Sequence, residues 1–472
     1  MALYLCKPKI KKLFFSIVPE KIFLFLGIVY GMLLLLITPP FQSPDEPEHF
    51  YRSFQISEGH LVAQKRQNGI GGDLPESLYV TAKMFHRLIL QPERKQNIED
   101  IFNLLSLPLN KDNRIFTHFP NTAVYSPIPY LPQALAISLG KLFYFSPLLL
   151  MYLGRISNLL IWVLLVYFAI KLTPFCKWLF FLLALMPMSL FQAASLSADS
   201  FTNCLSFLLI ALFLRIAFTE NSAIQKRHIY ILVILSLLLS LSKQVYFLIP
   251  LLFLLIPTDK FGARKKYFAI FFFFFFMNIV VLLIWYSIID IVRDIYKIYK
   301  LYEIYSVSPD KQMLFILSHP LEYCRILVMT YMENWKIYMD SFVGQLGHLD
   351  TSLSELFRVS YLTILIFVAL ADTHESIVIS LKQRCLIFLT LVASFIVINT
   401  IAYVGWTPVG KKFIGGIQGR YFIPISPLFF LLFYNKKFNL NLNRKGFNLM
   451  IICFSVFSLT YTLFVILHRY YF

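Results

Sequence analysis

Long uncharged apolar runs alternate with short polar and basic stretches along most of the chain. The first run, residues 22–39, has no charge and is about as long as the roughly 20 residues that cross a bilayer. It is too long for the apolar core of a cleaved signal, so we expect it to remain as an anchor. The pattern predicts an all-α, polytopic membrane helical bundle with about 11 spans, near 22–39, 148–170, 178–192, 199–217, 229–241, 244–257, 267–289, 356–371, 385–403, 421–434 and 447–466.

Basic residues gather at alternate ends of these runs. The positive-inside rule places such clusters on the cytoplasmic side, which puts the amino terminus inside and the carboxyl terminus outside. An alternative is that 229–257 forms one broken span instead of two. The clusters are Lys7, Lys9, Lys11 and Lys12, then Lys171 and Lys177, Lys226 and Arg227, Lys260 with Arg264 to Lys266, Lys382 and Arg384, and Lys436 and Lys437 with Arg444 and Lys445.

Two long external segments, 41–147 and 290–355, interrupt what we treat as a single membrane domain over residues 1–472. In the first segment, residues 76–90 place apolar and charged residues at helix spacing, which predicts helices lying on the membrane surface. Residues 127–146 are apolar enough for a further span, but counting them would turn the later basic clusters outward. Three prolines open this stretch, so we expect a re-entrant or interfacial helix here.

Composition supports the membrane class. Hydrophobic residues make up 58% of the 472 residues, more than a soluble domain of this size can cover. A net charge of +18 raises the question of nucleic acid, but the basic residues separate apolar segments and form no basic face. We therefore expect the lipid bilayer as a partner and no nucleic acid. No nucleotide-binding loop and no zinc-ligand spacing are present.

Candidate chemistry begins directly after the first span, at Phe-Gln-Ser-Pro-Asp-Glu-Pro-Glu-His-Phe-Tyr, residues 41–51. A structural explanation covers part of it. Ser43 would be the N-cap of a helix, Pro44 its first residue and Glu46 the third residue of a capping box. This explanation leaves the other titratable residues of the segment without a structural purpose.

If that helix continues from its proline, Asp45, His49 and Arg52 lie on one face, because they are spaced at i, i+4 and i+7. This face would offer a base, a second titratable group and a phosphate binder. We therefore take Asp45, Glu46 and His49 as candidate catalytic residues, with Arg52 as a candidate substrate-binding residue.

Three charged residues at the external ends of other spans extend the candidate site. Asp199 opens one span, and its structural alternative is a helix cap. Lys243 lies in a short external turn, contrary to the positive-inside rule, which suggests that it binds a lipid phosphate. The structural alternative is that its side chain simply extends to the membrane surface. Arg420 follows glycines that let backbone amides approach an anion, and arginine suits bidentate phosphate contact. We expect these three and Asp45 to gather around one pocket, with further substrate contacts from Tyr125, Gln192, Gln418 and Tyr421.

Together these polar segments resemble a known family over residues 20–465. The segments are Pro39 to His49, Tyr125 to Gln133, Gly154-Arg155, Leu196 to Asp199, Ser242-Lys243 and Gln418 to Tyr421. The pattern is similar to the bacterial multi-pass family catalogued as domain of unknown function 2142. That family in turn resembles the GT-C glycosyltransferases, which carry an acid in the first external loop and use polyprenyl-phosphate-linked sugars.

The resemblance implies a GT-C-like enzyme of the bacterial inner membrane, with its site facing the periplasm. Asp45 matches the first-loop acid that acts as general base, with Glu46 as its neighbour. A sugar would move from a polyprenyl-phosphate donor to a cell-surface glycan or lipid acceptor, with inversion. Binding of the donor phosphate by Lys243 and Arg420 is our inference from the residues, because the family shares no alignable motif there.

Three alternatives stay open. Asp45 and His49 could instead hold a divalent cation, magnesium or manganese, against the phosphate; no other cofactor is expected. A transporter or flippase of lipid-linked sugars would use the same cations without a base. A non-enzymatic scaffold would tolerate loss of the charged residues.

Overall fold

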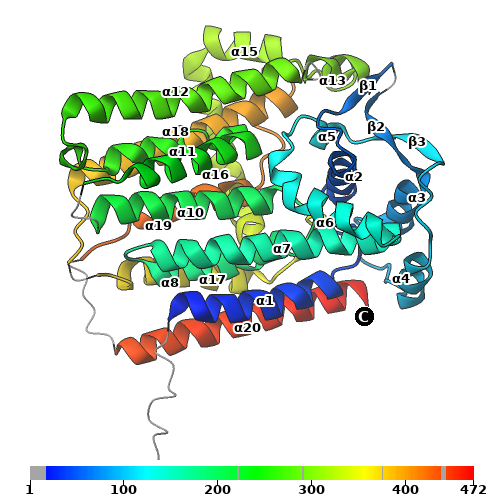
Figure 1. The fold of residues 1–472 in the computed structure, drawn as a ribbon, viewed down its shortest axis with the longest axis horizontal. Helices are drawn as coiled ribbons and strands as arrows, with labels where there is room; N and C mark the ends of the chain where they lie inside the picture. The colour runs from blue at the N-terminus through cyan, green and yellow to red at the C-terminus, as the bar shows by residue number, and fades with distance from the viewer. Residues whose placement is uncertain (1–17, 68, 220–222, 290–291, 375, 437–442) are drawn as a thin grey trace, which may run out of the picture.

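The computed structural model describes residues 18–67, 69–219, 223–289, 292–374, 376–436 and 443–472. The basic cluster that we expect before the first span, Lys7 to Lys12, lies outside these residues. Most of the described chain is helical. Long helices lie side by side in one bundle, and the first predicted external segment forms a smaller part at one end of it (Figure 1).

Six helices in the described residues are long and apolar enough to cross a membrane, and they form the frame of the bundle. Helix α10 lies at its centre, where 83% of its most apolar stretch is buried, whereas only 11% of that of α12 is buried. The chain is therefore a helical membrane protein, as predicted. The six are α1 (Pro19–Ile37), α7 (Pro147–Leu172), α10 (Ala198–Phe218), α12 (Arg264–Ile288), α18 (Leu381–Trp406) and α20 (Arg444–Tyr470).

The prediction of about 11 spans is wrong when spans are counted by helix length and apolar composition, because five of the predicted spans are short or broken elements. A helix of 17 residues, such as α11 or α17, covers only about 26 Å, less than a bilayer core of about 30 Å. Prolines, which lack the N–H donor, interrupt the others. The five are α8 (Lys177–Leu185) with α9 (Pro187–Ala193), α11 (Lys226–Ser242), η4 (Gln244–Tyr246) with η5 (Ile249–Leu255), α17 (Glu355–Ala371), and η7 (Gly419–Ile425) with α19 (Ser426–Leu431).

The first external segment is mixed in structure. The amphipathic stretch 76–90 forms the predicted helix α3 and a following 3-10 turn, η2. The stretch 127–146 forms α6, which has 12 residues, too few to cross a bilayer. Its helices are α2 (Glu46–Ser57), α3 (Glu76–Phe85), η2 (His86–Leu88), α4 (Ile98–Leu105), α5 (Pro120–Ala123), η3 (Ile128–Tyr130) and α6 (Leu131–Leu142).

This segment also contains a small sheet that the sequence analysis did not predict. Strands β1 (Gln64–Arg66), β2 (Gly69–Pro75) and β3 (Arg114–His118) pair antiparallel in that order. Glycine is required at Gly71, because a Cβ there would lie 1.8 Å from the carbonyl oxygen of Thr117.

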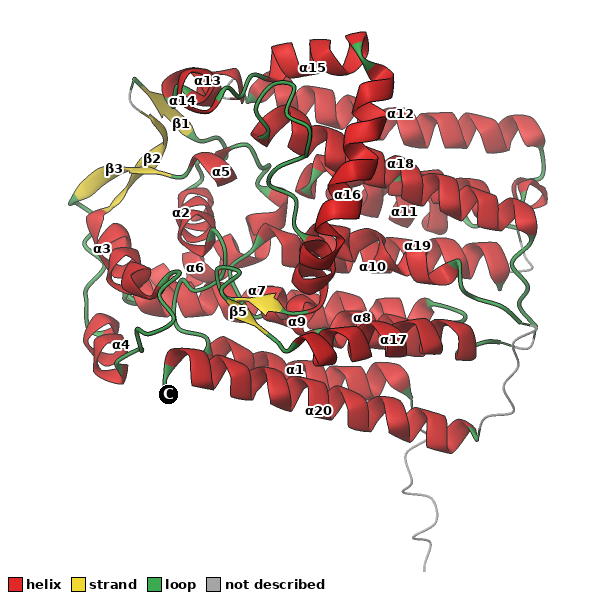
Figure 2. Ribbon diagram, turned by 180° about the vertical axis from the view of Figure 1, so that it is seen from behind, coloured by secondary structure: helices red, strands yellow, loops and turns green. Residues whose placement is uncertain are grey.

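In the second external segment, two helices meet at a sharp bend. Helix α15 (Pro309–Ser318) and helix α16 (Pro320–Val343) differ in direction by 106°. They are long and apolar enough for a seventh span only if the bent pair is counted as one span. Helix α16 runs across the long helices (Figure 2). The remaining elements are η6 (Thr258–Phe261), which precedes α12, and α13 (Val292–Ile298), α14 (Leu301–Tyr305), β4 (Gln345–Leu346) and β5 (Thr351–Ser352).

Candidate functional site

Helix α2 begins at Glu46, two residues later than predicted, and it has no capping box. Its N-cap is Asp45, which makes no side-chain cap and has a left-handed backbone, with φ of 58°. Ser43 instead donates to the hydroxyl oxygen of Ser195 at 3.2 Å. Aspartate tolerates this conformation better than most residues, and such backbone strain is common at functional sites. The exposed Asp45 is thereby turned out of the helix.

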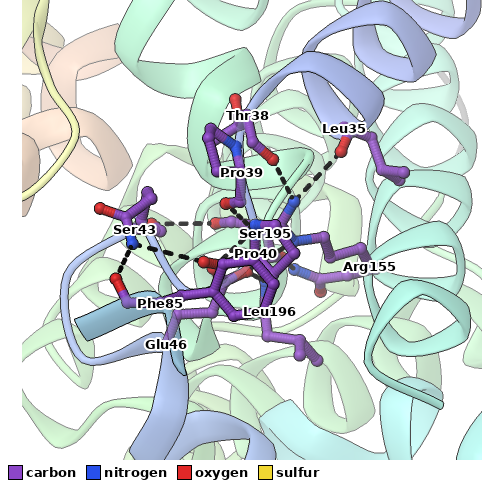
Figure 3. A network of polar contacts seen from close by, with 12 residues as sticks. Leu35, Thr38, Pro39, Pro40, Ser43, Glu46, Phe85, Arg155, Ser195 and Leu196 are labelled. Carbon is purple, nitrogen blue, oxygen red and sulfur yellow. Dashed lines mark hydrogen bonds and ion pairs between the residues drawn. The ribbon is translucent and has the colours of Figure 1, made fainter. Parts of the chain in front are cut away.

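Glu46, the next residue, is completely buried and cannot act as a catalytic group (Figure 3). Its carboxylate accepts two hydrogen bonds from Arg155 of α7, at 2.8 and 2.7 Å, and a third from the backbone N–H of Leu196 at 2.8 Å. Both of its carboxylate oxygens therefore have donors. The structure gives no support to the predicted catalytic role of Glu46 beside Asp45, because its carboxylate is enclosed by protein.

Arg155 completes this buried network from the other side. Its guanidinium also donates to the carbonyl oxygens of Leu35, Thr38 and Pro39, at 3.1, 2.9 and 3.1 Å. These carbonyls have no partner within helix α1, because they lie at or after its carboxyl end. The Glu46–Arg155 pair therefore fixes the end of α1, the start of α2 and the segment before α10 to one another (Figure 3).

A separate cavity of about 300 Å³ opens beside the start of α2. It brings together the four charged side chains that the sequence analysis expected around one pocket, from residues as far apart in the chain as Asp45 and Arg420. Its lining consists of Asp45, His49, Asn121, Thr122, Tyr125, Asp199, Lys243, Trp406, Gly416, Gln418, Arg420 and Tyr421.

Asp199 occupies the centre of the charge cluster in this cavity. Lys243 donates to one of its carboxylate oxygens at 2.7 Å, and the Nε of Arg420 lies 3.9 Å from the other. Gln192 donates to that second oxygen at 3.3 Å, but it does not line the cavity. Asn203 in turn donates to the Gln192 carbonyl oxygen at 3.1 Å. Gln192 thus positions Asp199, and the structure gives no support to its predicted role as a direct substrate contact.

One donor and one acceptor at the cavity have no hydrogen-bond partner in the part of the chain that the structure describes. The Nε of Arg420 is buried and has no hydrogen-bond partner among the described residues, and the same holds for the Oε1 of Gln418. Lys243 and Arg420 both lie near the ring of Tyr421, with the Nζ and Cζ atoms 4.5 and 5.4 Å from its centre. Such contacts favour the charged forms of both residues. One carboxylate thus faces two cations.

His49 lines the cavity in a neutral form. Its Nδ1 lies 2.8 Å from the hydroxyl oxygen of Tyr130. Burial lowers the pKa of His49 to about 4, although the nearby Asp45 carboxylate acts in the opposite direction. The ring is therefore uncharged near pH 7 and can exchange hydrogen bonds without bringing a further positive charge.

Arg52 does not reach the cavity, contrary to the predicted face of α2. It is fully buried and donates to the side-chain oxygen of Gln55 at 2.5 Å and to the carbonyl oxygens of Leu61 and Tyr125 at 2.6 and 3.3 Å. The structure therefore gives no support to its predicted role as a phosphate binder, because Arg52 lies outside the cavity and its two terminal nitrogens donate to Gln55 and to backbone carbonyls. It supports Tyr125, which does line the cavity.

A family model described as predicted membrane protein (DUF2142) matches residues 26–429. The chain belongs to the DUF2142 family. The matched range contains every residue that lines the cavity, and it confirms the family resemblance found in the sequence. No curated protein and no solved structure matches the chain, so the likeness to GT-C enzymes stays a prediction.

Several residues at the cavity of this DUF2142 protein were not predicted, among them Asn121, Thr122 and Trp406, which line it, and Glu48, which Asn121 contacts. The side chain and backbone amide of Asn121 donate to the two carboxylate oxygens of Glu48, at 2.9 and 2.8 Å. Burial, together with the charge of Asp45, raises the pKa of Glu48 to about 8. Asn121 comes from α5, a four-residue helix. An asparagine in an unpredicted short helix gave no sequence pattern from which to find it.

The proposed metal pair fits a cation poorly. Among the described residues, no three His, Cys, Asp or Glu side chains are placed to hold a metal ion together. Of the two candidate ligands, His49 already uses one ring nitrogen toward Tyr130. Magnesium and manganese prefer oxygen ligands in near-octahedral geometry. We therefore derive no step through a metal ion.

Proposed function

We propose that this DUF2142 protein is a membrane glycosyltransferase that moves a sugar from a polyprenyl-phosphate donor to a glycan or lipid acceptor. One observation carries the proposal: the cavity holds a carboxylate without a partner beside the buried Arg420 and the partly buried Lys243. The Asp45 side chain makes no hydrogen bond or ion pair to any described residue, whereas the Asp199 carboxylate is contacted by Lys243, Gln192 and Arg420. The two acids of the cavity therefore differ in function.

Asp45 is the general base of the proposed reaction. The acceptor hydroxyl forms a bond to the anomeric carbon while its proton passes to the Asp45 carboxylate. The bond from the anomeric carbon to the donor phosphate oxygen breaks, and its electron pair leaves with the phosphate. Direct displacement of this kind inverts the anomeric carbon. A positioned base contributes about 10²- to 10⁴-fold to such a step.

Lys243 and Arg420 stabilise the departing phosphate. Both are held before substrate arrives, because Asp199 binds Lys243 directly and lies near Arg420. Preorganised cations of this kind stabilise developing charge without reorganisation during the reaction. The uncharged His49 and the amide of Gln418 are placed to contact sugar hydroxyls in the same cavity.

The proposed setting is the bacterial inner membrane, with the cavity facing the periplasm. The cavity lies at the end of the bundle that carries the first external segment, because Asp45, Asn121 and Tyr125 of that segment line it. Cytoplasmic basic clusters and external substrate sites are expected at opposite ends of the spans.

The test is transfer by the purified full-length protein in nanodiscs, supplied with polyprenyl-phosphate sugars and a set of glycan and lipid acceptors. We expect sugar transfer or donor hydrolysis, and a loss of at least about 10²-fold in turnover in Asp45→Asn. Glu93→Gln, an exposed acid in the same external segment, is the matched control. Full turnover in Asp45→Asn would show that the base is wrong. Movement of labelled donor across a vesicle bilayer without covalent change would show a flippase instead.

A further inference from the structure

An apolar groove of about 450 Å³ lies beside the charged cavity, and the proposed reaction does not use it. Its walls come from α16, α17, α18 and the segment η7–α19. Apart from Ser426, all of its lining side chains are apolar or aromatic, among them Trp335, Leu362, Val392 and Phe395. A second apolar hollow, which shares Trp335 and Phe395, continues it along α16.

The short helix η7 separates this groove from the charged cavity. Gln418, Arg420 and Tyr421 line the cavity, whereas Phe422 and Ile425 line the groove. Gly419 packs directly on α16, where a Cβ would lie 1.9 Å from the carbonyl oxygen of Tyr338. Tyr421 and Phe422 are consecutive residues, so a ligand that occupies both sites extends past this pair.

The groove extends to hydrocarbon depth. Leu391 of α18 lines it, and it precedes Trp406 at the cavity by 15 residues, or about 22 Å of helix. The groove is also open to the outside of the bundle, since Trp335 is 56% exposed and Phe429 is 45% exposed. At this depth the surroundings of a membrane-spanning bundle are lipid chains and not water.

Given the proposed function, on which this inference rests, we infer that the groove binds the hydrocarbon chain of the phosphate-linked donor. The donor then enters sideways from the bilayer between α17 and α18, with its phosphate at Arg420 and Lys243. An apolar chain gains nothing from leaving lipid for an equally apolar surface. The contribution to binding therefore comes from close packing against the aromatic walls, which makes affinity depend on chain length and shape.

The chain offers a matched pair of variants to test this inference. Val392 lines the groove, and Val404 of the same helix lines a different cavity of about 310 Å³, which shares Asn121 and Trp406 with the charged site. Val392→Trp fills the groove, while Val404→Trp adds the same volume elsewhere. Leu362→Trp fills the groove from α17 and covers the case in which the first variant does not fold.

The measurement is the dissociation constant of two probes for the full-length protein in nanodiscs, a long-chain polyprenyl phosphate and its two-isoprene analogue. We expect the wild type to bind the long probe more tightly. Val392→Trp and Leu362→Trp should weaken long-probe binding by about tenfold and leave the short probe unchanged. Val404→Trp should change neither.

The outcomes separate this inference from the proposed function. Unchanged long-probe binding in both groove variants, or a loss in Val404→Trp alone, overturns the groove assignment. Dioleoyl phosphatidylglycerol that binds with the same dependence on Val392 would show an ordinary phospholipid site and also overturn it. Arg420→Gln should weaken both probes. If it weakens neither, or if the wild type binds neither probe, the phosphate site and the proposed function are overturned as well.

Discussion

Asp45 and Glu46 are adjacent acids in one polar segment, and the structure gives them opposite surroundings. Glu46 is fully buried, and three donors from Arg155 and Leu196 saturate its carboxylate. Asp45 is exposed in a cavity and has no described partner. The difference shows that the neighbours of a carboxylate, and not its position in a sequence motif, decide whether it stabilises the fold or stays available to a ligand.

The same contrast holds between the two charge clusters as wholes. In the Glu46–Arg155 network, side chains and backbone carbonyls satisfy one another, so no group is left for a ligand (Figure 3). In the Asp199 cluster, two cations share one carboxylate, and the Nε of Arg420 lacks a hydrogen bond among the described residues. The first cluster therefore holds the fold together, and the second keeps a donor, the Nε of Arg420, without a hydrogen bond among the described residues.

The largest expected effect breaks the first cluster. Glu46→Gln leaves the buried charge of Arg155 unpaired, so the free energy of unfolding should fall by about 3–5 kcal/mol. Asp45→Asn, one residue away, should change it by less than about 0.5 kcal/mol. Both are measured as unfolding free energies of the purified protein in the same detergent. Equal losses in the two variants would remove the distinction between the neighbouring acids.

A second, smaller effect uses a ligand to sharpen the comparison. Asp199→Asn leaves Lys243 and Arg420 without their shared carboxylate and should destabilise the protein, because two close cations then repel each other. A short-chain polyprenyl phosphate supplies the missing negative charge. At 100 times its dissociation constant it should return about 2.7 kcal/mol of stability.

The control for this rescue is the double variant Asp199→Asn with Arg420→Gln, which lacks one of the two proposed phosphate-binding cations and should gain less at the same ligand concentration. The readout is the unfolding temperature with and without ligand. A gain in the double variant that matches the gain in Asp199→Asn would mean that the phosphate stabilises the protein without binding at the cations.

The sequence was informative where chemistry depends on residue type and the side of the membrane. Charged residues at the external ends of spans are costly unless they have partners, and this argument was enough to place Asp45, Asp199, Lys243 and Arg420 together. It failed for Glu46, because its partner Arg155 is 109 residues away and nothing in the local pattern distinguishes it from Asp45.

The span count failed for a different reason. Hydropathy reports how apolar a segment is, but not whether its helix is continuous. The segments around Pro187, Pro250 and Pro424 are as apolar as true spans, yet they break into short helices inside the bundle. Because other parts of the protein surround these elements on most sides, they do not need the length of a helix that crosses the bilayer in contact with lipid.

The smallest expected effect concerns Glu48, whose surroundings are intermediate between those of Asp45 and Glu46. Glu48 is mostly buried, but its hydrogen-bond partner Asn121 lines the cavity. Its pKa is raised to about 8 in the fold by burial and by Asp45. The stabilisation from its bound proton is therefore fully present below the unfolded value of about 4.5 and is lost as the pH rises through 8. At pH 7 about one pH unit remains before the folded pKa of about 8 is reached. From pH 7 to pH 9 the free energy of unfolding of the wild type should therefore fall by about 1.4 kcal/mol relative to that of Glu48→Gln.

The measurement is the unfolding temperature of both proteins from pH 7 to pH 9, with the exposed Glu93→Gln as the control that follows the wild type. A wild type and a Glu48→Gln variant with parallel pH profiles would place Glu48 with the ordinary ionised acids, and its hydrogen bonds from Asn121 would then be those of a permanent carboxylate.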